Sequence, residues 1–167
     1  MTDSKNFTHV DAQGAAHMVD ISGKVPGQRQ AIAVATVQTR PDVIQLIEEN
    51  GLKKGDVLAV ARVAGIMAAK RTSDLIPLCH PLALTKVSVS FQLDQASGQI
   101  EISACCAVQG QTGVEMEALT AASVAALTIH DMCKAVDPAL QINGIQLQEK
   151  TGGKRGHWQR EQNHADS

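Results

Sequence analysis

A strict alternation of apolar and polar positions runs through residues 86–93 and resumes, after a turn at 95–98, through residues 100–108. Successive side chains of a β-strand point to opposite faces, so a period of two indicates a strand buried on one side. The two runs predict a β-hairpin whose apolar face consists of Val87, Val89, Phe91, Leu93, Ile100, Ile102, Ala104, Cys106 and Val108. Shorter runs with β-branched residues at 30–38 and 142–147 predict one further strand each, with Asn143-Gly144 as a bulge or turn.

Helical spacing and helix-end signals mark the segments between these strands. A short helix opens at Arg40-Pro41 and ends at Gly51, because proline favours a first helical turn and glycine a helix end. Asp56 can cap a second helix over 57–70, whose apolar face is formed by Val57, Val60, Ala64 and Met67. The longest helix is predicted over 117–136. Its stretch 118–129 carries no charge, which indicates that it is covered on more than one side.

The order of these elements is that of a split βαβ arrangement. We therefore expect an α+β protein of the ferredoxin-like βαββαβ type, with an antiparallel sheet covered by helices on one face. The chain divides into an N-terminal arm over 1–28, a single catalytic domain over 29–156 and a polar C-terminal tail over 157–167.

Composition narrows the class of protein. A hydrophobic fraction of 44% and a charged fraction of 19% are typical of a globular domain, and no apolar run is long enough to cross a membrane. The start lacks a signal peptide, so we expect a cytoplasmic protein whose four cysteines are reduced thiols. A net charge of −2 gives no support for nucleic-acid binding. Aromatic residues make up only 2%, so the small side chains of the core favour further burial by oligomerisation.

Two groups of polar residues stand out as candidates for chemistry. The loop 70–81 places Lys70, Arg71, Cys79 and His80 beside two prolines; an ordinary connector after a basic helix end is an equally good interpretation. Glu115 and Glu117 lie two positions apart. They would point to the same side if the chain is extended there, although capping acids at a helix start are the simpler interpretation.

Lysine supplies the remaining candidates. Asp131 and Lys134 can meet across one helical turn, and their apolar neighbours favour a lowered pKa for the lysine over an ordinary surface pair. Lysine stands beside glycine at 53–56 and again at 150–154, where exposed backbone N–H groups can bind an anion. The second run lacks the spacing of a phosphate-binding P-loop, and a flexible basic tail is its main alternative. No histidine–cysteine pair has a zinc spacing, so we expect no metal site.

Taken together, these stretches resemble the cyclic pyranopterin monophosphate synthase family, also called the MoaC family. The resemblance covers about residues 8–156 and is most specific in the run TGVEMEALTAASVAALTI at 112–129. It extends through DMCKAV at 131–136, DLIPLCHPL at 74–82 and KTGGK at 150–154. His130 stands where the family has a tyrosine, beside a site residue.

The resemblance implies a ferredoxin-like subunit assembled as a homohexamer, a trimer of dimers. It implies a lyase of molybdenum cofactor (molybdopterin) biosynthesis that converts (8S)-3′,8-cyclo-7,8-dihydroguanosine 5′-triphosphate, the product of an upstream radical enzyme, to cyclic pyranopterin monophosphate and pyrophosphate. No cofactor is implied, and Mg²⁺ with the triphosphate is left open. The catalytic candidates are Asp131, Lys134, Lys54 and His80. The substrate-binding candidates are Leu78, Cys79, His80, Met116, Glu117, Glu115, Arg29, Lys70, Arg71 and Lys154.

One expectation comes from geometry alone. Glu117 and Asp131 are fourteen positions apart, which on one helix is roughly 21 Å and too far for a single nucleotide pocket. We therefore expect each site to combine the glutamates of one chain with Asp131 and Lys134 of a neighbour. Two other classes compete with the enzyme: a ferredoxin-like module that binds a small ligand without changing it, and a zinc hydrolase.

Overall fold

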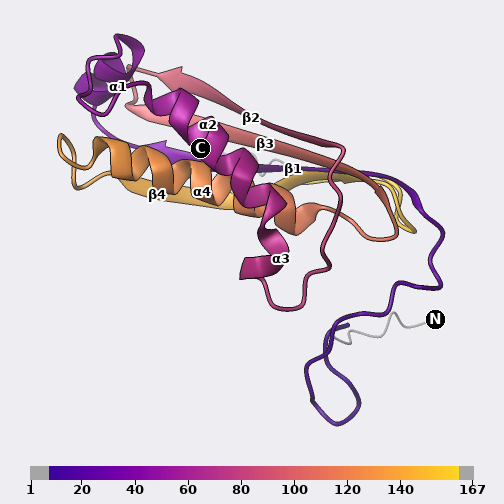
Figure 1. The fold of residues 1–167 in the computed structure, drawn as a ribbon. Coiled ribbons are helices and arrows are strands. Elements are labelled where there is room, and N and C mark those ends of the chain that lie inside the picture. Colours follow the sequence, from indigo (N-terminus) through magenta and orange to yellow (C-terminus); the bar gives the residue numbers. More distant parts are fainter. Residues whose placement is uncertain (1–7, 162–167) are drawn as a thin grey trace.

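A computed structural model describes residues 8–161 as an antiparallel five-stranded sheet covered on one face by two long helices (Figure 1). The strand order is β2-β3-β1-β4-β5, which confirms the predicted ferredoxin-like arrangement and adds a short edge strand. In chain order the elements are β1 (Gly27–Gln38), α1 (Pro41–Glu48), α2 (Val57–Lys70), α3 (Thr72–Leu75), β2 (Lys86–Asp94), β3 (Gln99–Gly110), α4 (Glu115–Cys133), β4 (Gln141–Thr151) and β5 (Trp158–Gln159).

Alternation along the strands decides which face of the sheet is buried. Strand β1 pairs with β3 in an unbroken antiparallel register, from Gly27 opposite Gly110 to Gln38 opposite Gln99. Its odd positions from residue 31 to residue 37 are buried beneath the helices, and the even positions between them are half-buried on the other face. The register with β4 shifts opposite Gly144, whose φ of 60° fits the predicted bulge.

Helix α2 has the predicted limits, but its buried face differs from the expected one. Asp56 caps the helix by accepting a hydrogen bond from the Ala59 N–H at 3.0 Å. Val60 and Met67, predicted on the apolar face, are 44% and 52% exposed. Close packing against α4 explains the correction, because a Cβ atom added at Gly65 would lie 2.9 Å from the Ala121 carbonyl oxygen. The smallest side chains therefore face α4, and the larger ones point outward.

Four features depart from the sequence-based expectation. Helix α4 begins at Glu115, so the two glutamates lie in its first turn and not on an extended segment. It ends at Cys133, three residues earlier than predicted. A short helix, α3, occupies the start of the predicted loop, and β5 pairs with β4 within the segment expected to be a polar tail. The last residues of that tail and the start of the arm lie outside the described residues.

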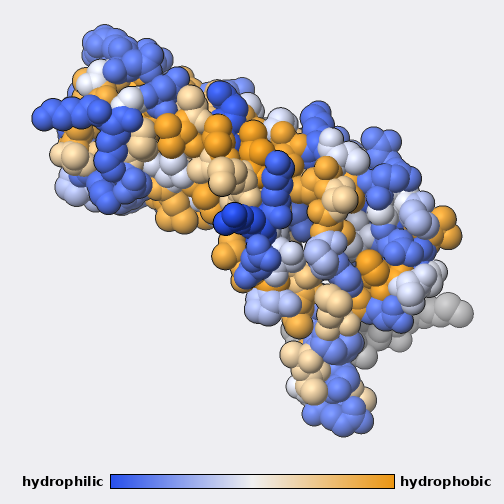
Figure 2. Space-filling model, viewed as in Figure 1, coloured by the Kyte–Doolittle hydropathy of each residue, from blue (hydrophilic) through white to orange (hydrophobic). Residues whose placement is uncertain are grey.

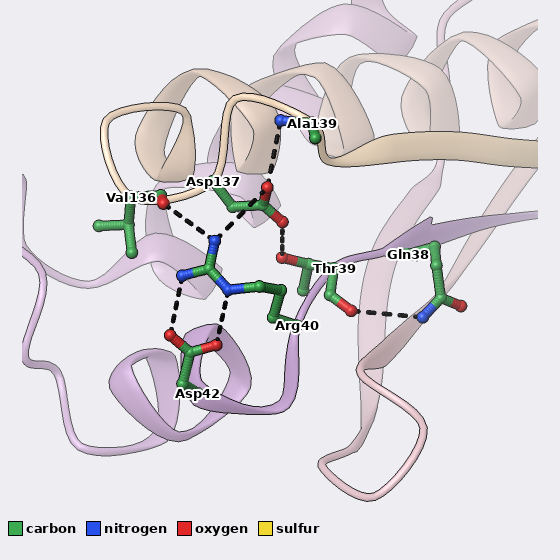
Figure 3. Close-up of polar contacts among 7 residues, drawn as sticks. All are labelled: Gln38, Thr39, Arg40, Asp42, Val136, Asp137 and Ala139. Carbon is green, nitrogen blue, oxygen red and sulfur yellow. Dashed lines mark hydrogen bonds and ion pairs between the residues drawn. The ribbon is translucent and has the colours of Figure 1, made fainter.

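A polar cluster joins the end of β1 to the segment that follows α4 (Figure 3). Asp137 is 5% exposed and accepts hydrogen bonds from the Thr39 hydroxyl at 2.6 Å and from the Ala139 N–H at 3.1 Å. Arg40 donates to the Val136 carbonyl oxygen, lies 3.8 Å from Asp137 and binds Asp42 through two nitrogens. We call this group the Asp137 latch. The latch holds the backbone in place at Asp137, three residues after Lys134.

The remaining features bear on the class of protein. The four cysteines are free thiols, as expected. Among the described residues, no helix combines the length and the apolar character that crossing a membrane requires.

Candidate active site

A cavity of about 350 Å³ lies at the N-terminal end of α4. The loop after α3 supplies one wall, the first turn of α4 supplies another, and the N-terminal arm closes the third side. The predicted residues that line it together are Leu78, Cys79, His80, Glu115, Met116 and Glu117. We call this space the α4 cavity. The fold thus brings together six of the predicted substrate-binding residues from two separate motifs.

The arm is held over this cavity by polar contacts. His80 Nε2 lies 2.8 Å from the Val19 carbonyl oxygen, which can only accept, so the Nε2–H of His80 donates. Gln111 donates to the Lys24 carbonyl oxygen at 2.9 Å. In Figure 1 the arm extends from the body beside α3, at the opposite end of the molecule from α1. The arm therefore positions His80 as well as enclosing the cavity.

The two glutamates of α4 have different surroundings. Glu115 is partly exposed and forms an ion pair with Lys150 of β4 at 2.9 Å. Glu117 is 5% exposed, and burial is the main cause of the raised pKa of its carboxyl group, with a smaller contribution from Glu115. One carboxylate is therefore neutralised by a cation, and the other belongs to a largely buried residue that lines the cavity.

A second cavity, of about 660 Å³, adjoins the first and shares Lys24, Gly113 and Glu115 with it. Its lining is rich in cations, contributed by the arm, by β1 and by the segment around the end of β4. These cations are Lys24, Arg29, Lys150, Lys154 and Arg155. We call this space the basic cavity. Its charge suits an anionic group such as a phosphate, held next to the carboxylates of the α4 cavity.

Glycines allow the chain to pass closely around Arg29. Gly152 and Gly153 have φ values of 94° and 78°, in the left-handed region that other residues rarely adopt. A Cβ atom at Gly152 would meet the Gln28 carbonyl oxygen, and one at Gly153 would meet the Arg29 guanidinium group. Arg29 Nε also donates to the Gly110 carbonyl oxygen at 3.3 Å. The turn therefore holds the Arg29 guanidinium group at the edge of the basic cavity.

Three catalytic candidates meet at the other end of α4. Asp131 accepts hydrogen bonds from Lys134 Nζ at 2.7 Å and from Lys54 Nζ at 3.1 Å, and Lys54 also bonds the Asp131 carbonyl oxygen at 2.8 Å. We call these residues the Asp131 triad. Their side chains are between 45% and 59% exposed, which corrects the expectation of apolar surroundings. The hydrogen bond from Lys134, followed by that from Lys54, lowers the pKa of Asp131.

The thiols near the site are poor nucleophiles. Burial raises the pKa of Cys79, with a smaller contribution from Glu117, and burial raises the pKa of Cys106 to about 12. A thiol reacts as its thiolate, so these side chains stay protonated at neutral pH. Cys79 therefore fits a role in lining the cavity.

Sequence reasoning missed three cations and grouped two others differently from the fold. Lys24, Lys150 and Arg155 line the joined cavities, although none of them was among the predicted site residues. Lys150 could have been found, because it precedes the glycine turn that was singled out. Lys70 is the last residue of α2 and Arg71 follows it, and Lys70 lines a separate small cavity beside Leu82 and Lys86. The described part of the chain contains no group of three or more His, Cys, Asp or Glu side chains suited to a metal.

Comparison with known proteins identifies the family of this chain. The model of the MoaC family matches residues 18–153. A cyclic pyranopterin monophosphate synthase of Chloroflexus aggregans is 59% identical over 156 residues, covering 93% of this chain and 94% of the relative. Relatives of the same name from Parvibaculum lavamentivorans and Chloroflexus aurantiacus are 57% and 58% identical, covering 93% and 96% of this chain and 97% and 99% of their own. The chain therefore belongs to the MoaC family.

Proposed function

We propose that this protein is a lyase of molybdenum cofactor biosynthesis that forms cyclic pyranopterin monophosphate. Its substrate is (8S)-3′,8-cyclo-7,8-dihydroguanosine 5′-triphosphate, and its second product is pyrophosphate. Family membership and the names of the relatives support this activity. The observation that carries the proposal is the union of the α4 cavity, which holds carboxyl groups, with the basic cavity.

The joined cavities match the two chemical parts of this substrate. Carboxyl groups in the α4 cavity can bind the amino and ring N–H groups that derive from guanine. Arg29, Lys150 and Lys154 in the basic cavity can bind the triphosphate and stabilise the charge of the departing pyrophosphate. The shared position of Glu115 between the cavities would place the reacting ring at their junction.

The Asp131 triad and His80 are our candidates for moving protons. With a lowered pKa, Asp131 is ionised at neutral pH, which suits a base or a partner that orients the lysine ammonium groups. Lys54 and Lys134 carry the transferable protons nearest to it, at 3.1 and 2.7 Å. Opening a guanine ring and closing a pterin needs several proton transfers, so more than one donor is required.

We expect purified protein to convert the cyclic nucleotide, with pyrophosphate and pterin product appearing in equal amounts. Pyrophosphate is measured by a coupled phosphate assay and the pterin by fluorescence after oxidation. A protein in which both Asp131 and Lys134 are alanine serves as the control and is expected to be inactive. Binding of the nucleotide without either product would favour a binding module, and activity that depends on bound zinc would favour a hydrolase.

The expectation that two chains share each site follows from the positions of Glu117 and the Asp131 triad on α4. We call these two groups the half-sites. Glu117 lies in the first turn of α4 and the Asp131 triad lies at its last turn, on the order of 20 Å away. Both half-sites contain residues proposed to act on one nucleotide. A second copy of the chain must therefore bring its own Asp131 triad to the α4 cavity of the first.

The outer face of the helical layer is suited to this pairing. Val60, Val63 and Met67 of α2 and Leu127 of α4 are between 44% and 59% exposed. Figure 2, viewed from the helical side, shows apolar residues gathered over these helices. If two copies pack these faces about a two-fold axis perpendicular to α4, each α4 runs antiparallel to its partner's α4. The last turn of one helix then lies near the first turn of the other.

We expect two inactive variants, Asp131→Ala and Glu117→Ala, to regain activity when mixed. Random exchange of subunits makes half of the dimers mixed, and each mixed dimer has one intact site of two, so the rate should reach about a quarter of wild type. Turnover is measured before and after the two proteins are unfolded and refolded together. Each variant refolded alone is the control. Confirmed mixing without recovery would mean that each site lies within one chain.

The hexameric state, the supply of substrate by a radical enzyme, the cytoplasmic compartment and the absence of a cofactor remain predictions. So does the question of Mg²⁺ with the triphosphate. Size-exclusion chromatography with light scattering measures the number of subunits, and turnover in a chelator measures the need for a metal.

A further inference from the structure

We propose that His80 exchanges protons with the ligand through Nδ1 alone, because the main-chain carbonyl of Val19 in the N-terminal arm holds its Nε2–H. The arm is then a positioning element, which fixes the ring nitrogen that is free for the ligand and acts on turnover through His80. The inference rests on the proposed function, since it takes a ligand in the α4 cavity that gains and loses protons.

The hydrogen bond between the arm and the imidazole decides where the ring carries its proton. His80 Nε2 lies 2.8 Å from the Val19 carbonyl oxygen, which has no proton to give. A neutral imidazole has one N–H, so this N–H is at Nε2 and Nδ1 is a bare acceptor. When the ring takes up a second proton, that proton goes to Nδ1 and the bond to Val19 stays. The two protonation states therefore differ only at Nδ1.

Nδ1 is open to the space that His80 lines. Among residues 8–161, no side chain or backbone group bonds to it. His80 is half-buried, and in the described part of the chain no residue of this kind has a side-chain nitrogen or oxygen that is both buried and unbonded. An unbonded Nδ1 is therefore accessible. Because the ring lines the α4 cavity, a ligand there can reach this atom.

The other titratable groups of the cavity leave Nδ1 free to act. Glu115 is paired with Lys150, and the Cys79 thiol stays protonated. None of the titratable side chains that line the cavity bonds to His80 within the described residues: His9, Lys24, Cys79, Glu115 and Glu117. A proton that Nδ1 takes from the ligand gives an imidazolium, and its return to another ligand atom restores the neutral ring. The exchange therefore needs no further reactant.

A second contact holds the arm independently of His80. Gln111 Nε2 donates to the Lys24 carbonyl oxygen at 2.9 Å, five residues after Val19. Both Val19 and Lys24 line the α4 cavity, so the arm passes along it between the two contacts. Gln111→Leu removes this donor and leaves His80 and Val19 unchanged. The variant therefore loosens the arm without altering the groups of the proposed hydrogen bond.

The position of the ring proton is tested without a ligand. In protein labelled with ¹⁵N at histidine, solid-state NMR distinguishes a protonated ring nitrogen from a bare one by its chemical shift. The signals of His80, one of six histidines, are those that His80→Gln removes. We expect a protonated Nε2 at pH 8, and a bare Nε2 at that pH would overturn the proposal.

Limited proteolysis tests the contact with the arm. A glutamine amide at the ε position can still donate to Val19, whereas alanine cannot. We expect trypsin to cut after the exposed Lys24 about fivefold faster in His80→Ala than in wild type, and at about the wild-type rate in His80→Gln. His157→Gln replaces an exposed histidine outside both cavities and is the control that should match wild type. Equal rates in His80→Ala and wild type would contradict the contact.

Turnover decides whether the arm acts through His80. We expect His80→Gln to lower kcat at least about 100-fold with KM within about threefold of wild type, because glutamine holds the arm but has no titrating group at the Nδ1 position. Gln111→Leu should lower kcat about tenfold in wild type but less than about twofold in His80→Gln, where no base is left to position. Equal losses in the two backgrounds would sink the proposal, as would a His80→Gln protein with wild-type kcat. If wild type shows no turnover, the proposed activity fails, while NMR and proteolysis still decide the ring proton and the arm contact.

Discussion

Asp131→Asn and Asp131→Ala are each expected to lower kcat at least about 100-fold while leaving the unfolding transition unchanged. The Asp131 carboxylate holds two ammonium groups at 2.7 and 3.1 Å, and asparagine keeps its shape but loses the charge that orients them. All three side chains are close to half exposed or more, so the fold does not depend on the triad. Steady-state turnover and thermal melting measure the two effects separately.

The control for this experiment is Glu49→Gln. Glu49 is an exposed acid that accepts a hydrogen bond from Gln45 on the surface of α1 at 2.8 Å and touches neither cavity. Its substitution should leave both kcat and melting as they are. Undiminished turnover in a folded Asp131→Asn protein would remove the triad from the mechanism.

Asp137→Ala is expected to lower the free energy of unfolding by about 2–4 kcal/mol. The Asp137 carboxylate is buried and accepts hydrogen bonds from the Thr39 hydroxyl and the Ala139 N–H, and its removal leaves both donors without their partner (Figure 3). Urea unfolding at fixed protein concentration measures the loss as a shift of the midpoint.

Asp42→Ala is the matched control for Asp137, because both carboxylates face the same arginine. Asp42 and Arg40 are at least half exposed, so the loss of their ion pair should barely move the unfolding midpoint. Equal shifts for the two variants would mean that burial of Asp137 contributes nothing beyond the ion pair. Since the latch follows Lys134 by three residues, Asp137→Ala should also lower kcat more than Asp42→Ala does.

Sequence patterns predicted the elements well where a local rule decides them. Alternation in β2 and β3, the proline at the start of α1 and the cap at Asp56 each act within a few residues. The buried face of α2 could not be predicted in this way. It depends on how closely α4 approaches Gly65, which is a property of two segments far apart in the chain.

The candidate site shows the same division. The sequence by itself determined the residue types and the separation of Glu117 from Asp131, because helical rise converts a count of residues into a length. Only the tertiary structure placed Lys150 beside Glu115, joined the two cavities and left the Asp131 triad open to water. Charge state depends on burial and on partners brought from other strands, so the contrast between Glu115 and Glu117 arises only in the folded chain.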